Sequence, residues 1–272
     1  MYNATMLETL VSPIVQIHYA YTKKREKEMG YSLTFHNLAP HWINGLMIFD
    51  MSHVWKKFGL NAIGVNYFTI GAVKNGLSTR FDAKSPYYQA WLGGYIVRFA
   101  KPHAWTLEDH FKLGVSDQKN WLKLYGDQNP FVEVDLSSLK NRGKITIGEY
   151  EGALYEGNIW SDTDIGKGKS FLPLPLLMSG GAHHFNKDNP HLNVNYQNFI
   201  PKWKQNAEPL APYQKILLKG YIGLIPLNAT TKVMLYANGC EFTDKRGEKY
   251  DHFKTIKEEL RALLEKVEIR KL

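Results

Sequence analysis

The chain has a single cysteine and no long apolar segment among its 272 residues. One thiol, Cys240, cannot form an internal disulfide, and this favours a reducing compartment. No stretch approaches the roughly 18 uncharged apolar residues that mark a candidate membrane-spanning helix. Residues 1–12 lack a basic segment followed by an apolar run, so we expect no secretory signal. These absences predict a soluble, cytoplasmic protein without a transmembrane segment.

Specific catalytic motifs are missing as well. The chain contains no Gly-x-Ser-x-Gly, no His-Glu-x-x-His and no Gly-x-Gly-x-x-Gly, so the sequence supports neither a serine-hydrolase elbow, nor a zinc-protease helix, nor a standard dinucleotide fold. Gly168-Lys169-Ser170 resembles the end of a phosphate-binding loop, but the next five residues, which include Pro173 and Pro175, cannot form the helix that must follow. No motif is specific enough to assign a family, an enzymatic activity or a cofactor.

Positive charge is in excess and unevenly spread. The net charge is +8, and residues 201–272 hold 14 basic and 9 acidic side chains. A basic surface can attract nucleic acid, acidic lipid or an anionic ligand. Lys219-Gly220-Tyr221 opens like the RNA-recognition strand motif, but Ile222 and Gly223 do not continue it. Nucleic-acid binding through this basic quarter is therefore the weakest of three functional alternatives.

Apolar periodicity predicts an α+β fold. A C-terminal helix, capped by Asp251 or Thr255, carries one apolar stripe that we expect to pack on the strands before it. Further helices are expected at residues 13–28 and 106–125, and strands at 60–73, 88–99, 144–160, 215–225 and 232–242. The last two strands form a predicted hairpin. The whole is a mainly antiparallel, curved sheet with an N-terminal helix, a central helical segment and a C-terminal helix on the sheet.

The first expectation for domain organisation is a single α+β domain over residues 1–272. The alternative has an N-terminal part, 1–130, and a C-terminal sheet-and-helix part, 131–272. Glycine, asparagine and proline residues interrupt the chain near 126–143, where such a boundary would lie.

The leading functional hypothesis is a binding protein with an aromatic-walled pocket. Aromatic residues form 13% of the chain, on the high side for a globular protein, and ligand pockets are mostly apolar with a few placed polar groups. The candidate ligand-binding residues are Trp42, Trp91, Trp105 and Tyr221. The ligand is a small molecule, and the positive net charge allows it to be an anion.

The alternative is an enzyme whose histidine-containing loop acts as an acid/base or holds a metal. His183 and His184 follow Gly180-Gly181 within the proline- and glycine-rich span 161–214, and a loop can turn both rings toward one point. A nearby carboxylate, Glu149 or Glu151, would complete a catalytic site, and His191 would complete a metal site. The sequence leaves the choice between binding protein and enzyme open, together with the oligomeric state.

Overall fold

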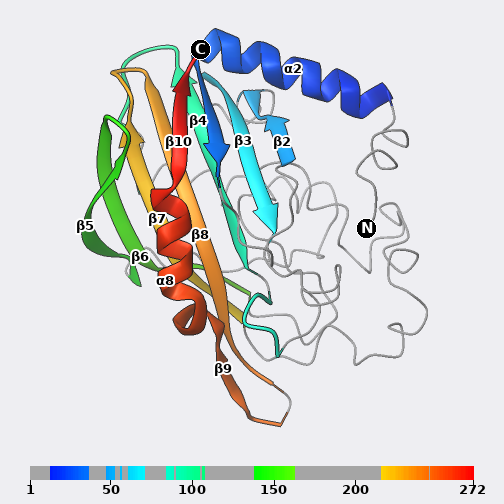
Figure 1. Ribbon diagram of the computed structural model, residues 1–272, viewed down its shortest axis with the longest axis vertical. Coiled ribbons are helices and arrows are strands. Elements are labelled where there is room, and N and C mark those ends of the chain that lie inside the picture. The colour runs from blue at the N-terminus through cyan, green and yellow to red at the C-terminus, as the bar shows by residue number, and fades with distance from the viewer. Residues whose placement is uncertain are drawn as a thin grey trace.

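The computed structural model describes residues 13–36, 47–52, 56, 61–70, 84–88, 90–104, 106–107, 138–162, 216–244 and 246–272. All structural statements below concern these residues. They form a mostly antiparallel β structure with two helices, so the α+β prediction is confirmed at this level (Figure 1).

The main sheet is antiparallel and has the strand order β2-β3-β4-β8-β7-β6-β5, with β9 paired to β8. Its strands are β2 (Met47–Asp50), β3 (Ala62–Ile70), β4 (Trp91–Phe99), β5 (Lys140–Ile147), β6 (Tyr150–Asp162), β7 (Ile216–Pro226), β8 (Thr231–Thr243) and β9 (Lys249–Asp251). The predicted strands at 60–73 and 88–99 are therefore confirmed as β3 and β4. The predicted strand region 144–160 is a hairpin, β5 and β6, which turns at Gly148 with a φ of 61°.

The predicted hairpin at 215–242 is confirmed as β7 and β8. Its turn is closed by the Asn228 side chain, whose Oδ1 accepts hydrogen bonds from the backbone N of Thr230 at 2.9 Å and of Thr231 at 2.7 Å. An asparagine that binds the backbone two and three residues ahead fixes the turn locally. The two strands then pair in one unbroken register from Ile216↔Phe242 to Pro226↔Lys232.

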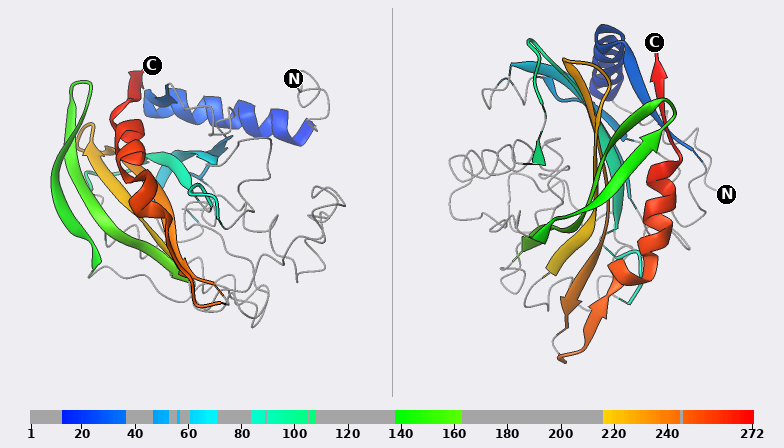
Figure 2. Two further views of the ribbon diagram at one scale, coloured as in Figure 1. Left: turned by 60° about the horizontal axis from the view of Figure 1, so that its bottom comes forward. Right: turned by 90° about the vertical axis from the view of Figure 1, so that its left-hand side faces the viewer.

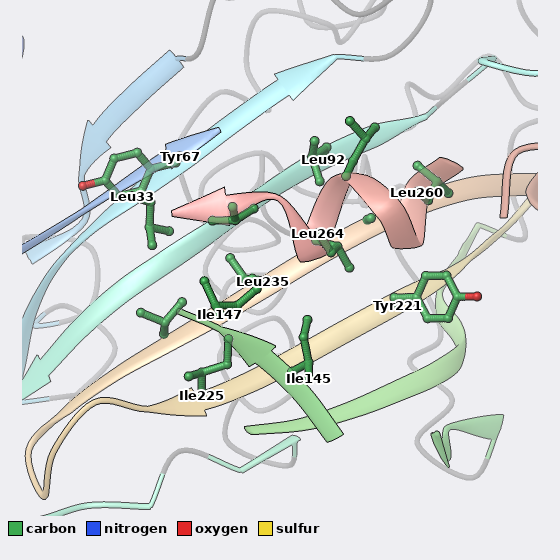
Figure 3. Packing of buried hydrophobic residues seen from close by; sticks show 14 of the residues in the cluster. Leu33, Tyr67, Leu92, Ile145, Ile147, Tyr221, Ile225, Leu235, Leu260 and Leu264 are labelled. Carbon is green, nitrogen blue, oxygen red and sulfur yellow. The ribbon is translucent and has the colours of Figure 1, made fainter. Parts of the chain in front are cut away.

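Helix α8 (His252–Glu265) packs along the β7–β8 hairpin, as the apolar stripe predicts. Asp251 caps it by accepting a hydrogen bond from the backbone N of Lys254 at 2.9 Å. Figure 2 shows the helix lying along one face of the sheet, and Figure 3 shows Leu260 and Leu264 above Leu235 of β8. Burial of such leucine side chains contributes about 1.5–3 kcal/mol each. The buried stripe is Phe253, Ile256, Leu260, Leu263 and Leu264.

Helix α2 (Pro13–Met29) confirms the predicted N-terminal helix. It ends at Gly30, whose φ of 77° suits a glycine and whose backbone N donates to Glu26 O at 2.8 Å. The chain then enters β1 (Tyr31–Phe35), which pairs with β10 (Val267–Lys271) at the other end of the chain. The sequence did not predict this two-stranded ribbon.

Several predictions fall on parts of the chain that the structure does not describe. The central helical segment lies outside the described residues apart from 106–107. Of the region 126–143, where a domain boundary would lie, residues 126–137 are also outside them. The single-domain arrangement and its two-part alternative stay predictions. Neither of the two described helices is long and apolar enough to cross a membrane.

Candidate ligand-binding face

The main sheet has two faces, and the register of its strands assigns each residue to one of them. A Cβ built on Gly239 of β8 would lie 2.8 Å from Phe253 Cα, so Gly239 faces α8. Side chains alternate along a strand, and Asn238 and Cys240 therefore point the opposite way. We call the side turned away from α8 the distal face. Directly opposite residues of antiparallel strands share a face, which extends the assignment across the sheet.

The distal face carries two buried carboxamides between tyrosine rings. Asn66 of β3 is 0% exposed and Asn238 of β8 is 1% exposed. Tyr95 of β4 and Tyr236 of β8 are equally buried, and their ring centroids lie 5.8 Å apart. Polar side chains at such depth carry a large desolvation cost unless they are hydrogen-bonded. This face therefore holds costly polar groups that the fold has to satisfy.

The hydroxyl of Tyr236 links the neighbouring strands. It donates to the backbone O of Tyr67 at 3.2 Å and lies 3.5 Å from Oδ1 of Asn66. Complete burial raises the pKa of Tyr236 well above its ordinary value near 10, so the hydroxyl keeps its proton. Tyr236 is thus a fixed, neutral donor on the distal face.

Gly93 makes room for this hydroxyl. A Cβ at Gly93 would lie 2.2 Å from Tyr236 Oη and 2.2 Å from Tyr67 O. At Gly94, which points toward α8, a Cβ would lie 2.7 Å from Met234 O. The strands on either side of β4 therefore approach it closely at the Gly93-Gly94 pair.

Asn238 sits at the middle of the distal surface of β8, between Tyr236 and Cys240. Its register partners are Trp91 of β4 on one side and Gly220 of β7 on the other. Its Nδ2 donates a hydrogen bond to Gly239 O at 3.4 Å. Gly220 places no side chain beside the carboxamide.

Cys240 is buried and protonated. Its Sγ lies 3.1 Å from the backbone O of Tyr88. Burial raises its pKa well above the ordinary value, and the nearby carboxylates Asp251 and Glu241 raise it further. A thiol kept protonated is a poor nucleophile. Cys240 is thus a buried cysteine that is not part of a disulfide.

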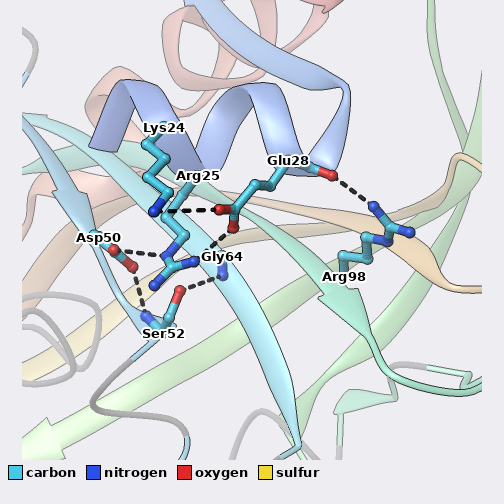
Figure 4. Close-up of polar contacts among 7 residues, drawn as sticks. All are labelled: Lys24, Arg25, Glu28, Asp50, Ser52, Gly64 and Arg98. Atoms are coloured by element: carbon cyan, nitrogen blue, oxygen red, sulfur yellow. Dashed lines mark hydrogen bonds and ion pairs between the residues drawn. The ribbon is translucent and has the colours of Figure 1, made fainter. Parts of the chain in front are cut away.

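The face of the sheet beneath the helices holds charged groups in paired form. Figure 4 shows Arg25 of α2 between two carboxylates, with its Nε 3.0 Å from Asp50 Oδ2 and its Nη1 2.5 Å from Glu28 Oε2. Asp50 also accepts from the backbone N of Ser52 at 2.8 Å, and Ser52 Oγ accepts from Gly64 N at 3.1 Å. This network fastens α2 to β2 and β3, so we assign it to the fold.

The structure places three of the predicted site residues, with their side chains, away from the distal carboxamides. Glu149 and Glu151 lie exposed at the β5–β6 turn, where Glu151 Oε1 is 2.7 Å from Lys144 Nζ. Tyr221 points toward α8, is 1% exposed, and meets the Phe253 ring edge-on at 5.6 Å. Tyr221 thus packs in the core beneath the helix.

The remaining predicted site residues cannot be placed at the level of side chains. Trp91 belongs to a distal position of β4 by its register with Asn238, and its side chain is outside the description. Trp42, Trp105, His183, His184 and His191 lie outside the described residues. In the described part of the chain, no three histidine, cysteine or acidic residues are grouped closely enough to hold a metal ion.

Sequence reasoning missed the distal carboxamides. The available signal was an asparagine inside an otherwise apolar strand, as in Val65-Asn66-Tyr67 and Ala237-Asn238-Gly239. Comparison with known proteins finds no matching family model, no matching curated protein and no matching solved structure. The candidate site therefore rests on the geometry of this chain.

Proposed function

We propose that this chain is a binding protein that holds a small ligand against the distal face, with Asn238 at the centre of the site. Two buried carboxamides, Asn66 and Asn238, set among the tyrosine rings Tyr95 and Tyr236, carry this proposal. Ligand sites typically combine aromatic or apolar walls with a small number of polar groups that fix orientation. In this proposal Trp91, at the register position beside Asn238, belongs to the aromatic wall.

The chemistry of the neighbouring groups favours binding over catalysis. Tyr236 and Cys240 flank Asn238, and burial keeps both protonated. Their O–H and S–H groups already donate to the backbone O of Tyr67 and of Tyr88, and pKa values raised by burial do not suit a general acid or base near neutral pH. Trp42 and Trp105 remain proposed wall residues, and a sheet curved around the ligand remains part of the proposal.

Native mass spectrometry of the untagged protein, followed by a thermal-shift screen, tests this function. A ligand at about 100 times its Kd stabilises the folded state by about 2.7 kcal/mol. For a chain of this size that corresponds to a rise in Tm of about 5–10 °C. Absence of any bound species, together with absence of any compound that raises Tm, would refute the proposed function.

The Asn238→Leu variant locates the site. It removes the carboxamide at nearly constant shape, so we expect ligand affinity to fall at least about tenfold, because buried hydrogen bonds of this kind contribute about 1–3 kcal/mol. Asn61→Leu is the matched control, since Asn61 is exposed just before β3. For each variant, the rise in Tm caused by the ligand is measured from that variant's own ligand-free Tm. Equal affinity of wild type and Asn238→Leu would place the ligand elsewhere, and chemical turnover of the ligand would make the protein an enzyme.

A further inference from the structure

Helix α2 is fastened to the sheet through its second half. The buried residues described on it are Thr22, Glu26 and Met29, and the Glu26 carboxylate accepts the hydroxyl of Tyr67 at 2.5 Å. Figures 1 and 2 show the beginning of the helix extending past β2, the strand at that end of the main sheet. Because Tyr67 is opposite Gly94, which points toward α8, the helix lies on the side of the sheet away from the distal face.

The extending half of α2 carries exposed apolar side chains. Ile17, Tyr19 and Tyr21 are 56%, 55% and 53% exposed, and they are three of the four large apolar residues exposed among those described. A helix turns by about 100° per residue, so Ile17 and Tyr21 lie about 40° apart and Tyr19 about 160° from both. Exposed apolar groups of this kind mark interaction sites. A groove of a partner protein covers one side of a helix, whereas a lipid layer surrounds it.

Positive charge follows directly after this apolar half. The first ten residues of α2 contain no Asp, Glu, Lys or Arg, whereas the next six contain four basic and two acidic side chains. The Lys24 side chain is 65% exposed and lies 4.0 Å from the half-buried Glu28, and Lys27 is exposed as well. The Glu26 carboxylate is only 3% exposed. The charge that this part of the helix presents to its surroundings is therefore positive, which complements anionic lipid headgroups.

We propose that the first half of α2 inserts into the surface of an anionic membrane, with Lys24 and Lys27 at the level of the phosphates. Ten residues of helix span about 15 Å, about half of a hydrocarbon core of roughly 30 Å. This segment can enter one leaflet and cannot cross the bilayer. Tyrosine is enriched at membrane–water interfaces, and lysine stems extend along apolar surface to reach the headgroups. The proposal is independent of the proposed ligand site, which is on the opposite face.

Sedimentation of the full chain with lipid vesicles tests the proposal. One set of vesicles is phosphatidylcholine alone, and the other holds equal parts of phosphatidylcholine and phosphatidylserine. We expect binding to the anionic vesicles to be at least about fivefold stronger than to the neutral ones. Raising the ionic strength from about 0.1 M to about 1 M shortens the Debye length from about 10 Å to about 3 Å and should weaken the binding.

Two double variants of α2 separate the apolar and the charged contributions. Ile17→Ser with Tyr21→Ser removes apolar side chains and should weaken binding to the anionic vesicles at least about tenfold. Lys24→Gln with Lys27→Gln removes two charges and should weaken it at least about fivefold. All four residues are exposed, so the urea midpoints of both variants should stay close to that of the wild type.

Matched controls remove the same kinds of group elsewhere. Leu272→Ser changes the fourth exposed large apolar residue among those described, and Lys254→Gln with Lys266→Gln removes two exposed charges from α8. Both controls should bind the anionic vesicles as the wild type does. Equal binding of the wild type and both α2 variants would overturn the proposal, and so would the absence of binding to anionic vesicles. A dimer in light scattering that Ile17→Ser with Tyr21→Ser dissociates, without vesicle binding, would overturn it in favour of a second copy of the chain. None of these results bears on the proposed ligand site.

Discussion

Gly93→Ala is the substitution for which the structure sets the clearest magnitude. The added Cβ would lie 2.2 Å from Tyr67 O and 2.2 Å from Tyr236 Oη, whereas real Cβ contacts essentially never fall below 3.0 Å. The strand or the tyrosine must therefore move by at least 0.8 Å, the difference between these two distances. Tyr67 O is backbone in the paired strand β3, so it cannot swing aside as a flexible side chain can.

The expected cost has two parts. Overpacking of a tight interior costs about 1–3 kcal/mol, and loss of the buried hydrogen bond from Tyr236 to Tyr67 O adds about 1 kcal/mol. We therefore expect the free energy of unfolding to fall by about 2–4 kcal/mol, measured by urea titration followed by circular dichroism.

Gly223→Ala is the matched control for this prediction. Gly223 also lies within a central strand, but its nearest neighbour to a new Cβ is a side-chain atom of Ile145 at 3.5 Å, an ordinary contact. Alanine there restricts the unfolded chain and should stabilise the protein by about 0.4–1 kcal/mol. Unfolding free energies of the two variants that agree within about 0.5 kcal/mol would refute the tight packing of Tyr236 over Gly93.

Three further predictions concern single side chains. Tyr67→Phe removes the hydroxyl that donates to the buried Glu26 carboxylate at 2.5 Å, and should lower the unfolding free energy by about 2 kcal/mol in a urea titration. Burial, and then Glu26, raise the pKa of Tyr67 above its ordinary value near 10. The free energy of unfolding should therefore be intact below pH 10 and fall above it, and it should fall less steeply with pH in Tyr67→Phe. Equal pH slopes of the unfolding free energy in wild type and variant would contradict this. Asp251→Ala removes the cap on the backbone N of Lys254 and should cost about 1 kcal/mol, and an unchanged urea midpoint would argue against the cap. Cys240 should resist iodoacetamide in the native protein and react in urea, as followed by intact mass, whereas rapid native alkylation would show an accessible thiol.

Elements with strong local signals could be predicted from the sequence. The β7–β8 hairpin is set by two alternating apolar runs around a turn that Asn228 closes with its own side chain. Helix α8 has a cap at Asp251 and an apolar stripe at helical spacing. In each case the forces that form the element act between residues close together in the chain, which is where sequence patterns are informative.

The β1–β10 ribbon shows where such signals end. Each strand has five residues, too few for a convincing alternation, and the partners come from opposite ends of the chain. Pairing such as Phe35↔Val267 is specified by tertiary packing, which no local pattern records.

The candidate site was harder to predict than the fold for the same reason. Tyr221 resembled an exposed stacking residue, but its register opposite Ala237 turns it toward α8 and into the core. Asn238 resembled an ordinary polar residue of a half-exposed strand. Its burial depends on what covers both faces of the sheet, and a strand's own sequence does not state this.

Nuclear magnetic resonance of the asparagine side chains tests the central claim most directly. In protein labelled with ¹⁵N at asparagine, each carboxamide NH₂ gives its own signals, assigned by Asn238→Leu and Asn66→Leu. On titration with the compound that raises Tm most in the thermal-shift screen, the Asn238 signals should shift and saturate. Those of Asn228, in the exposed turn, should stay in place. If the protein is saturated with ligand and the Asn238 signals have not moved, this would contradict a binding site on the distal face.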